Sequence, residues 1–143
     1  MSEKTTTPQT LRASAALPAS GAYDSSPTKI HLASCTQSVT VECTYTRGGS
    51  GGYCALKPEL SFDGTTWMRA TIGTGVLSST APDGTMPLVC LLYSSPVPSS
   101  GSALTFAVNF DVQGARYFRC AAAEVGATGT PGTLAMRLVE DAS

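Results

Sequence analysis

The chain has 143 residues, of which 42% are apolar and 13% charged, and its formal net charge is −1. This length suits one domain, and ordinary hydrophobicity with low net charge is not typical of a disordered chain. The nine basic residues are scattered and the overall field is weak, which argues against binding to nucleic acid or to an anionic membrane surface. Low net charge also leaves little repulsion between identical copies, which permits close packing of subunits.

The N-terminal residues and the cysteines indicate folding in a reducing compartment. Residues 1–7 contain no apolar run of the kind that a secretory signal needs, and no window is apolar enough for a membrane span. The five cysteines are odd in number and widely spaced, which fits neither a disulfide framework nor a Cys-x-x-Cys metal site. We therefore expect synthesis in the cytoplasm, and we expect thiols at Cys35, Cys43, Cys54, Cys90 and Cys120.

Residues 1–8 are polar and rich in threonine, so they have no apolar face to bury. We predict a mobile N-terminal arm over 1–8 and a single domain over 9–143. Two weak strand signals follow, at 11–17 and at 29–32, on either side of a region rich in turn-forming residues.

The clearest strand signal lies over 39–46, where apolar and polar residues alternate one by one. The glycine-rich residues 47–52 are typical of a hairpin tip, and the alternation resumes over 54–62 as a return strand. Pro58 cannot donate a ladder hydrogen bond, so it predicts a sheet edge or a bulge in that strand.

The pair Asp63–Gly64 predicts a tight turn, because aspartate tolerates and glycine prefers a positive φ. A strand over 67–72 should then pair back onto 56–62. Loops rich in glycine, proline and serine separate the further strand signals, which lie at 88–93, 104–110, 116–124 and 134–138. No stretch keeps the helical apolar spacing for three turns. The chain is therefore predicted to be all-β, an antiparallel β-sandwich or jelly roll of about eight strands.

The residues that enzymes use are scarce in this sequence. The one histidine, His31, has apolar neighbours and is interpreted as an ordinary strand residue. Ser50 lies in a Gly-x-Ser-x-Gly match, but within a glycine loop between two predicted strands rather than at a strand-to-helix turn. The carboxylates include no calcium-loop pattern. We predict that the protein is not an enzyme and that it has no catalytic residues, no cofactor and no metal site.

Aromatic side chains offer one further kind of site. A group of them could form a platform on which a sugar ring stacks, although single aromatic residues in strands are more often core or subunit contacts. The residues concerned are Tyr23, Tyr53, Trp67, Tyr93 and Tyr117.

Two segments carry a family resemblance. Residues 60–67, Leu-Ser-Phe-Asp-Gly-Thr-Thr-Trp, resemble the S-x-D-G-x-x-W hairpin of discoidin-like carbohydrate-binding sandwiches, and residues 114–119, Gly-Ala-Arg-Tyr-Phe-Arg, resemble their A-R-Y-x-R strand. The same two elements, closed by a strand like 132–138, are also similar to small structural proteins of tailed-bacteriophage virions. The resemblance covers roughly 39–139. The chain departs from discoidin domains in lacking their terminal disulfide and a secretory signal.

The resemblance to the phage group implies a virion protein, made in the cytoplasm of a host bacterium. Its partners would be further copies of itself and other virion proteins such as the major capsid protein. The first expectation is a homo-oligomeric capsid decoration (cement) protein. The alternatives are a neck, collar or tail component, or a carbohydrate-binding module with a glycan as its ligand. Subunit contacts are expected at Thr5, Thr6, Thr7, Trp67, Arg116 and Arg119, where each arginine could offer a guanidinium fork to a neighbouring carboxylate or carbonyl.

Overall fold

The computed structural model describes residues 7–48, 52–69, 93–95, 103–112, 114–126 and 129–142. Apart from a single 3₁₀ turn, η1 (Ala19–Gly21), its regular elements are all strands. In chain order the strands are β1 (Gln9–Ala16), β2 (Ile30–His31), β3 (Thr36–Thr46), β4 (Tyr53–Ser61), β5 (Met68–Arg69), β6 (Tyr93–Ser94), β7 (Ala103–Asp111), β8 (Tyr117–Val125) and β9 (Thr133–Ala142).

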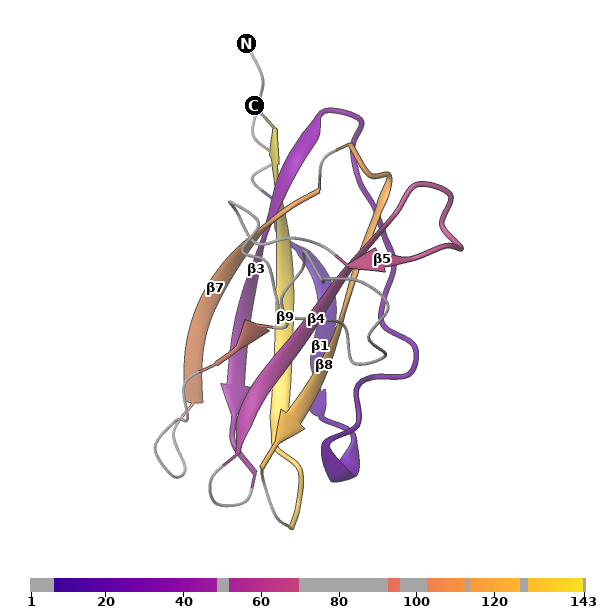
Figure 1. Ribbon diagram of the computed structural model, residues 1–143. Helices are drawn as coiled ribbons and strands as arrows, with labels where there is room; N and C mark the ends of the chain where they lie inside the picture. The colour runs from indigo at the N-terminus through magenta and orange to yellow at the C-terminus, as the bar shows by residue number, and fades with distance from the viewer. Residues whose placement is uncertain are drawn as a thin grey trace.

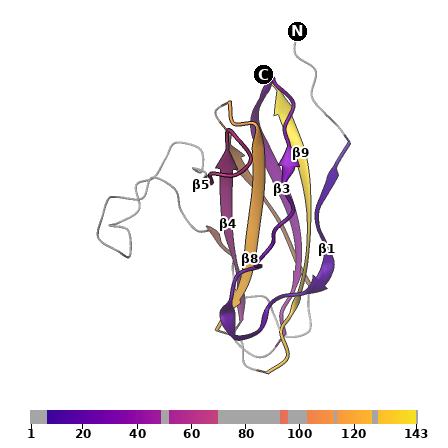
Figure 2. The ribbon, with the colours of Figure 1, turned by 90° about the vertical axis from the view of Figure 1, so that its right-hand side faces the viewer.

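The strands form two antiparallel sheets that face each other (Figure 1). The first sheet has the order β1-β9-β3-β7, and the second has the order β2-β8-β4-β5, with β6 also paired to β4. Figure 2 shows the two layers nearly edge-on, with β4 and β8 in one layer and β1, β3 and β9 in the other. The predicted all-β sandwich is thereby confirmed.

Alternation along the strands places the core between the two sheets. In β3 every second residue is fully buried, which is the face that the period-two pattern predicts. Phe110 of β7 and Phe118 of β8 meet across the sandwich, with ring centroids 6.0 Å apart. The inner faces of the other strands supply further buried side chains, among them Leu56, Cys120, Leu134, Met136 and Leu138.

The predicted hairpin between 39–46 and 54–62 is wrong. β3 pairs with β7 and β9, whereas β4 pairs with β8, so the glycine-rich residues between them carry the chain from one sheet to the other. Gly48 and Gly132 approach each other closely at this crossing, where a Cβ on Gly48 would lie 2.5 Å from the amide nitrogen of Gly132. Glycine is needed there because two connections share one space, not because a hairpin turn requires it.

Pro58 lies inside a regular stretch of β4 rather than at a bulge. Its register with Cys120 of β8 is continuous along the whole strand. The backbone of Cys54 bonds to Ser95 beyond β6, so by alternation the nitrogen of Pro58 also faces away from β8. It falls between the short pairings of β4 with β6 and with β5, and none of the strand pairs described on that side includes Pro58.

The predicted turn at Asp63–Gly64 is confirmed. Gly64 has a φ of +83°, and Asp63 Oδ1 accepts hydrogen bonds from the amides of Thr65 and Thr66 at 2.8 and 2.7 Å. These amide donors lower the pKa of Asp63 well below its usual range. The strand after the turn pairs back onto β4 as predicted, through Glu59–Arg69 and Leu60–Met68. Residues 70–72 and 88–92 of the predicted strands lie outside the described residues.

The cysteines of the described residues are free thiols. Cys35 is exposed, while Cys43, Cys54 and Cys120 are buried between the sheets. Burial raises the pKa of Cys54 to about 12 and holds the pKa of Cys43 and Cys120 well above the usual range. Cys90 lies outside the described residues.

Alkylation should separate these cysteines by burial. In the native protein without reductant, Cys35 should react with iodoacetamide while Cys43, Cys54 and Cys120 stay unmodified, because thiolate is scarce there and access is blocked. In denaturant all five cysteines should be labelled, which intact mass and peptide mapping would measure. Native labelling of Cys43 as fast as that of Cys35, or fewer than five labels in denaturant, would contradict this expectation.

Candidate functional site

Two of the predicted subunit-contact residues lie together on the outer face of the second sheet. The guanidinium carbon of Arg119 lies 4.0 Å from the centre of the Trp67 ring, and Arg119 Nε donates to Glu59 Oε1 over 2.9 Å. The β4–β8 pairing places Glu59 directly opposite Arg119. The guanidinium is therefore engaged within the chain, and it covers one face of the indole ring. Contacts of Arg119 with a neighbouring subunit and of Trp67 with a sugar ring stay predictions.

Arg116 is not part of this cluster. Its side chain is exposed and makes no ion pair with any described residue, while its backbone bonds to Leu32 and Ser61 at 2.8 and 3.0 Å. It lines a groove of about 780 Å³ beside the β2–β3 connection, together with Gln9 and His31. Arg116 thus presents an available guanidinium to a carboxylate or carbonyl of another molecule.

The three predicted threonines precede the first strand. Thr7 is exposed ahead of β1, and Thr5 and Thr6 lie outside the described residues.

His31 is an exposed residue of the short strand β2. Its ring stacks on that of Tyr117, with centroids 4.8 Å apart and an interplanar angle of 21°, and Lys29 Nζ lies 5.1 Å from the centre of the Tyr117 ring. The position agrees with the interpretation of His31 as a strand residue.

Replacing His31 with glutamine should have little effect on stability. The substitution removes one exposed ring stack, which is worth about 1 kcal/mol or less, and leaves the β2–β8 backbone pairing in place. Thermal unfolding of H31Q and of the wild-type protein would measure this. A loss of several kcal/mol would show that His31 has a role that the ring stack does not explain.

Glu124, which the sequence analysis did not single out, joins the two sheets at the end where the chain crosses between them. Its carboxylate accepts hydrogen bonds from the Tyr45 hydroxyl at 2.5 Å and from the amides of Gly48 and Gly132 at 3.0 and 2.9 Å. Burial alone raises the pKa of Glu124, but these three donors bring it below the usual range. Burial raises the pKa of Tyr45, and the hydrogen bond to Glu124 raises it further.

The lowered pKa of Glu124 makes its contribution to stability depend on pH. A carboxylate that ionises more readily in the folded state stabilises the fold fully above its unfolded pKa of about 4.3, and the contribution is lost as the pH falls through the folded pKa. The free energy of unfolding of E124Q should therefore fall less between pH 6 and pH 3 than that of the wild-type protein (roughly the range in which carboxylates titrate). Urea unfolding at several pH values would measure the two slopes, and equal slopes would contradict the assignment.

Glu140 has a similar structural role near the opposite end of the sandwich. It accepts hydrogen bonds from Gln9 Nε2 at 2.8 Å, from the Ala33 amide at 2.7 Å and from Thr36 Oγ1 at 2.6 Å. It is buried, and these donors come from β1, β3 and the β2–β3 connection. Both buried glutamates are thus occupied in holding the chain together.

The burial of both glutamates could have been predicted from the alternation in the sequence. Glu124 lies on the same alternation as Phe118 and Cys120, and Glu140 lies on the same alternation as Leu138. A carboxylate on the core-facing side of a strand needs internal donors.

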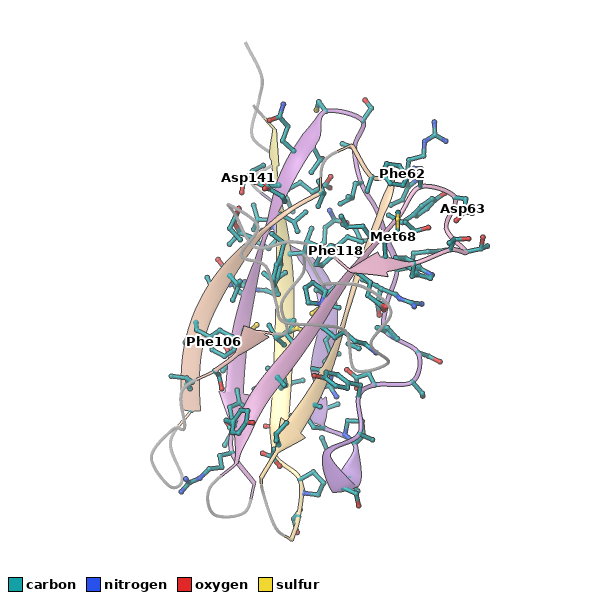
Figure 3. All side chains as sticks on the ribbon, viewed as in Figure 1. Phe62, Asp63, Met68, Phe106, Phe118 and Asp141 are labelled. Carbon is teal, nitrogen blue, oxygen red and sulfur yellow. The ribbon has the colours of Figure 1, made fainter. Side chains whose placement is uncertain are left out.

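Two exposed apolar side chains near the β4–β5 turn were also missed by the sequence analysis. Phe62 and Met68 are 53% and 46% exposed, and they line a small hollow of about 260 Å³ together with Asp63 and Thr66. Figure 3 shows the two side chains close together beside the turn. Exposed apolar side chains that gather in one place favour contact with another protein surface.

The first sheet has two edges that differ in regularity. At one edge, the pairing of β1 with β9 shifts register twice, and Arg12 fills the irregular part. Its guanidinium donates to the carbonyls of Ala15, Ala16 and Leu134 at 2.9, 3.0 and 2.6 Å, and it forms an ion pair with Asp24. Irregular pairing and an inserted charge are two ways in which proteins keep an edge strand from pairing with other chains.

β7, at the other edge of this sheet, is regular throughout. It pairs with β3 in unbroken register over all nine of its residues, and within the described part of the chain no strand lies on its other side. It contains no proline or glycine, and its one charged residue, Asp111, stands at its end. At the edges of the second sheet lie three strands of only two residues each, β2, β5 and β6.

The alternation of backbone hydrogen bonds shows which groups of β7 face outward. The Val112 amide donates to the Gln37 carbonyl at 3.0 Å, so the even-numbered residues of this segment bond to β3. The odd-numbered residues therefore direct their amides and carbonyls away from β3. They are Ala103, Thr105, Ala107, Asn109 and Asp111.

Neither a cluster of metal-ligating side chains nor a membrane-spanning helix is found within the ranges that the structure describes. These residues include no group of three or more histidine, cysteine or acidic side chains that could hold a metal ion. They also form no helix with the length and hydrophobicity of a membrane span.

No family model, no curated protein and no solved structure matches the chain.

Proposed function

We propose that this chain is a non-enzymatic virion structural protein, a capsid decoration protein of a tailed bacteriophage. It forms homo-oligomers and binds the major capsid protein. The resemblance of residues 60–67 and 114–119 to small phage virion proteins is the reason for proposing a phage particle as the location. The surface of the sandwich is the reason for proposing assembly.

The observation that carries the proposal is the edge strand β7. Among the described residues, β7 is a long, regular edge without inward charges, proline or bulges, which soluble monomers avoid because the outward amides and carbonyls of such an edge pair readily with another strand. The opposite edge, at β1, is broken by register shifts and by Arg12. The contrast within one sheet favours β7 as a surface for assembly.

The polar interior supports a structural role. Every buried side-chain nitrogen and oxygen of the described residues has a hydrogen-bond partner within the chain. The buried carboxylates of Glu124 and Glu140 are each held by three donors, an arrangement that supports the fold rather than proton transfer. Exposed Arg116 and the pair Phe62 and Met68 provide polar and apolar contacts for a larger surface.

Gold labelling of particles tests the proposal. Antibodies raised against the purified chain would be applied to tailed-phage particles from the bacterium that expresses it, and the particles would be imaged by electron microscopy. The expected result is regular labelling of the head. Labelling confined to the neck or tail would overturn the decoration role, and particles without label would overturn the virion assignment. An unrelated antibody serves as the control.

A further inference from the structure

We infer that β7 receives the N-terminal arm of a second copy of this chain, which adds residues 2–7 to the sheet as a further strand. This inference rests on the proposed assembly function and names the partner segment for the β7 edge. Strand addition of this kind obtains its affinity from main-chain hydrogen bonds, and the odd-numbered residues of β7 already present those groups outward.

The arm has the composition of a donor strand. Residues 2–7 are Ser-Glu-Lys-Thr-Thr-Thr, and threonine is among the residues that favour extended strands. The segment contains neither glycine nor proline, and Pro8, which has no amide proton, marks its end. Fully extended, eight residues span about 26 Å, and the nine residues of β7 span about 30 Å.

The topology prevents a chain from reaching its own β7 with this arm. β1 and β7 lie at opposite edges of the first sheet, three strand intervals apart, which is about 14 Å. Gln9 pairs with Leu138, and β9 continues beyond that point to Ala142, so the arm would first have to pass the end of β9. Passing the end of β9 takes about 13 Å in addition to the 14 Å across the sheet. The path to the chain's own β7 therefore uses the whole extended length of the arm, about 26 Å.

Exchange between copies has no such limit. Each copy has one arm and one β7 edge, so each junction joins the arm of one protomer to the edge of the next, and the contact repeats or closes by symmetry. Figure 1 shows β7 at one side of the sheet, and β1 is the strand at the other edge. The sheet of the receiving copy would then have the order β1-β9-β3-β7-arm.

Two proline variants of the full-length chain test the inference. A107P removes an amide that faces outward from β7 and that the β3 ladder does not use, so the fold should be retained. T6P removes an amide from the arm, three residues before β1 begins. A107T and T6V are the matched controls, because they change the same side chains and keep the amides. Circular dichroism and thermal unfolding confirm that each variant is folded.

Sedimentation velocity over a range of concentrations gives the readout. The wild-type protein, A107T and T6V should self-associate with the same Kd, and in A107P and T6P that Kd should rise at least about tenfold, since a main-chain bond is lost and the ring obstructs the approach. A mixture of A107P with T6P should form a one-to-one dimer, because the first supplies an intact arm and the second an intact edge.

The contrary results are equally specific. Unchanged association of A107P would show that β7 is not the acceptor. Because neighbouring amides of a strand face opposite sides, unchanged association of both T6P and the adjacent variant T5P would show that the arm is not the donor. A wild-type protein that stays monomeric, or a mixture that forms no dimer, would overturn exchange between copies. Gold labelling of the particle can succeed or fail independently of each of these outcomes, so failure of the inference and failure of the proposed function are distinguishable.

Discussion

Replacing Glu124 with alanine should lower the free energy of unfolding by about 3–4 kcal/mol, because three buried or partly buried donors are left unpaired at about 1 kcal/mol or more each. The donors are the hydroxyl of Tyr45 and the amides of Gly48 and Gly132, which come from two parts of the chain, around 45–48 and at 132. Urea unfolding followed by tryptophan fluorescence would measure the difference.

Glu42 provides the matched control for this substitution. It is also a glutamate in a strand, but its side chain is 41% exposed and its ion pair with Arg137 is open to solvent. E42A should therefore cost less than about 1 kcal/mol. If E124A were no more destabilised than E42A, the account of Glu124 as the link between the sheets would be wrong.

Replacing Gly132 with alanine should destabilise the protein by about 3 kcal/mol or more, at the upper end of what overpacking costs. An added Cβ would overlap the carbonyl oxygen of Thr46 and would lie 2.5 Å from Glu124 Oε2 and 2.7 Å from the Gly48 nitrogen. Two of these three atoms belong to the backbone, and the third is held by its own hydrogen bonds, so none can move away at low cost. Thermal and urea unfolding would measure the loss.

Gly129 is the matched control in the same connection. A Cβ there would meet nothing within 4 Å, but the φ of +87° lies in the left-handed region, so G129A should cost about 1 kcal/mol. Equal destabilisation of G132A and G129A would mean that the close approach of the two connections does not constrain the fold.

Alternation in the sequence predicted which faces of the strands are buried, because a period of two follows directly from strand geometry. It holds over β3, where Val39, Val41, Cys43 and Tyr45 are buried, and the Asp63–Gly64 turn was predicted for an equally local reason. Features that depend on a few neighbouring residues could thus be predicted from the sequence alone.

Strand partners could not be predicted in the same way. A glycine-rich loop of six residues can close a hairpin or cross the roughly 10 Å between two sheets, and its composition does not distinguish these. The structure takes the second course between β3 and β4. The edge position of β7 could not be predicted from the sequence either, since it follows from the pairing order of the strands and not from the alternation within β7.

For the candidate site residues too, local features could be predicted from the sequence and contacts between strands could not. Trp67 and Arg119 were predicted as outward contacts, but their mutual packing, and the ion pair of Arg119 with Glu59, depend on the register of three strands. Glu124 could have been found, because it falls on the core-facing alternation of β8. Its donors could not, since two of them, Tyr45 and Gly48, lie more than 70 residues away in the sequence, and the third depends on the path of the connection after β8.

Hydrogen exchange at the amides of β7 tests most directly the claim that this strand is an assembly surface. The free protomer, at low concentration, should exchange the amides of Thr105, Ala107 and Asn109 quickly, because they face away from β3, while Val108 and Phe110 stay protected. In the associated protein the three odd-numbered amides should become protected as well, with no change at Val108 and Phe110. If those three amides exchange equally fast in the free and the associated protein, assembly does not use the edge of β7.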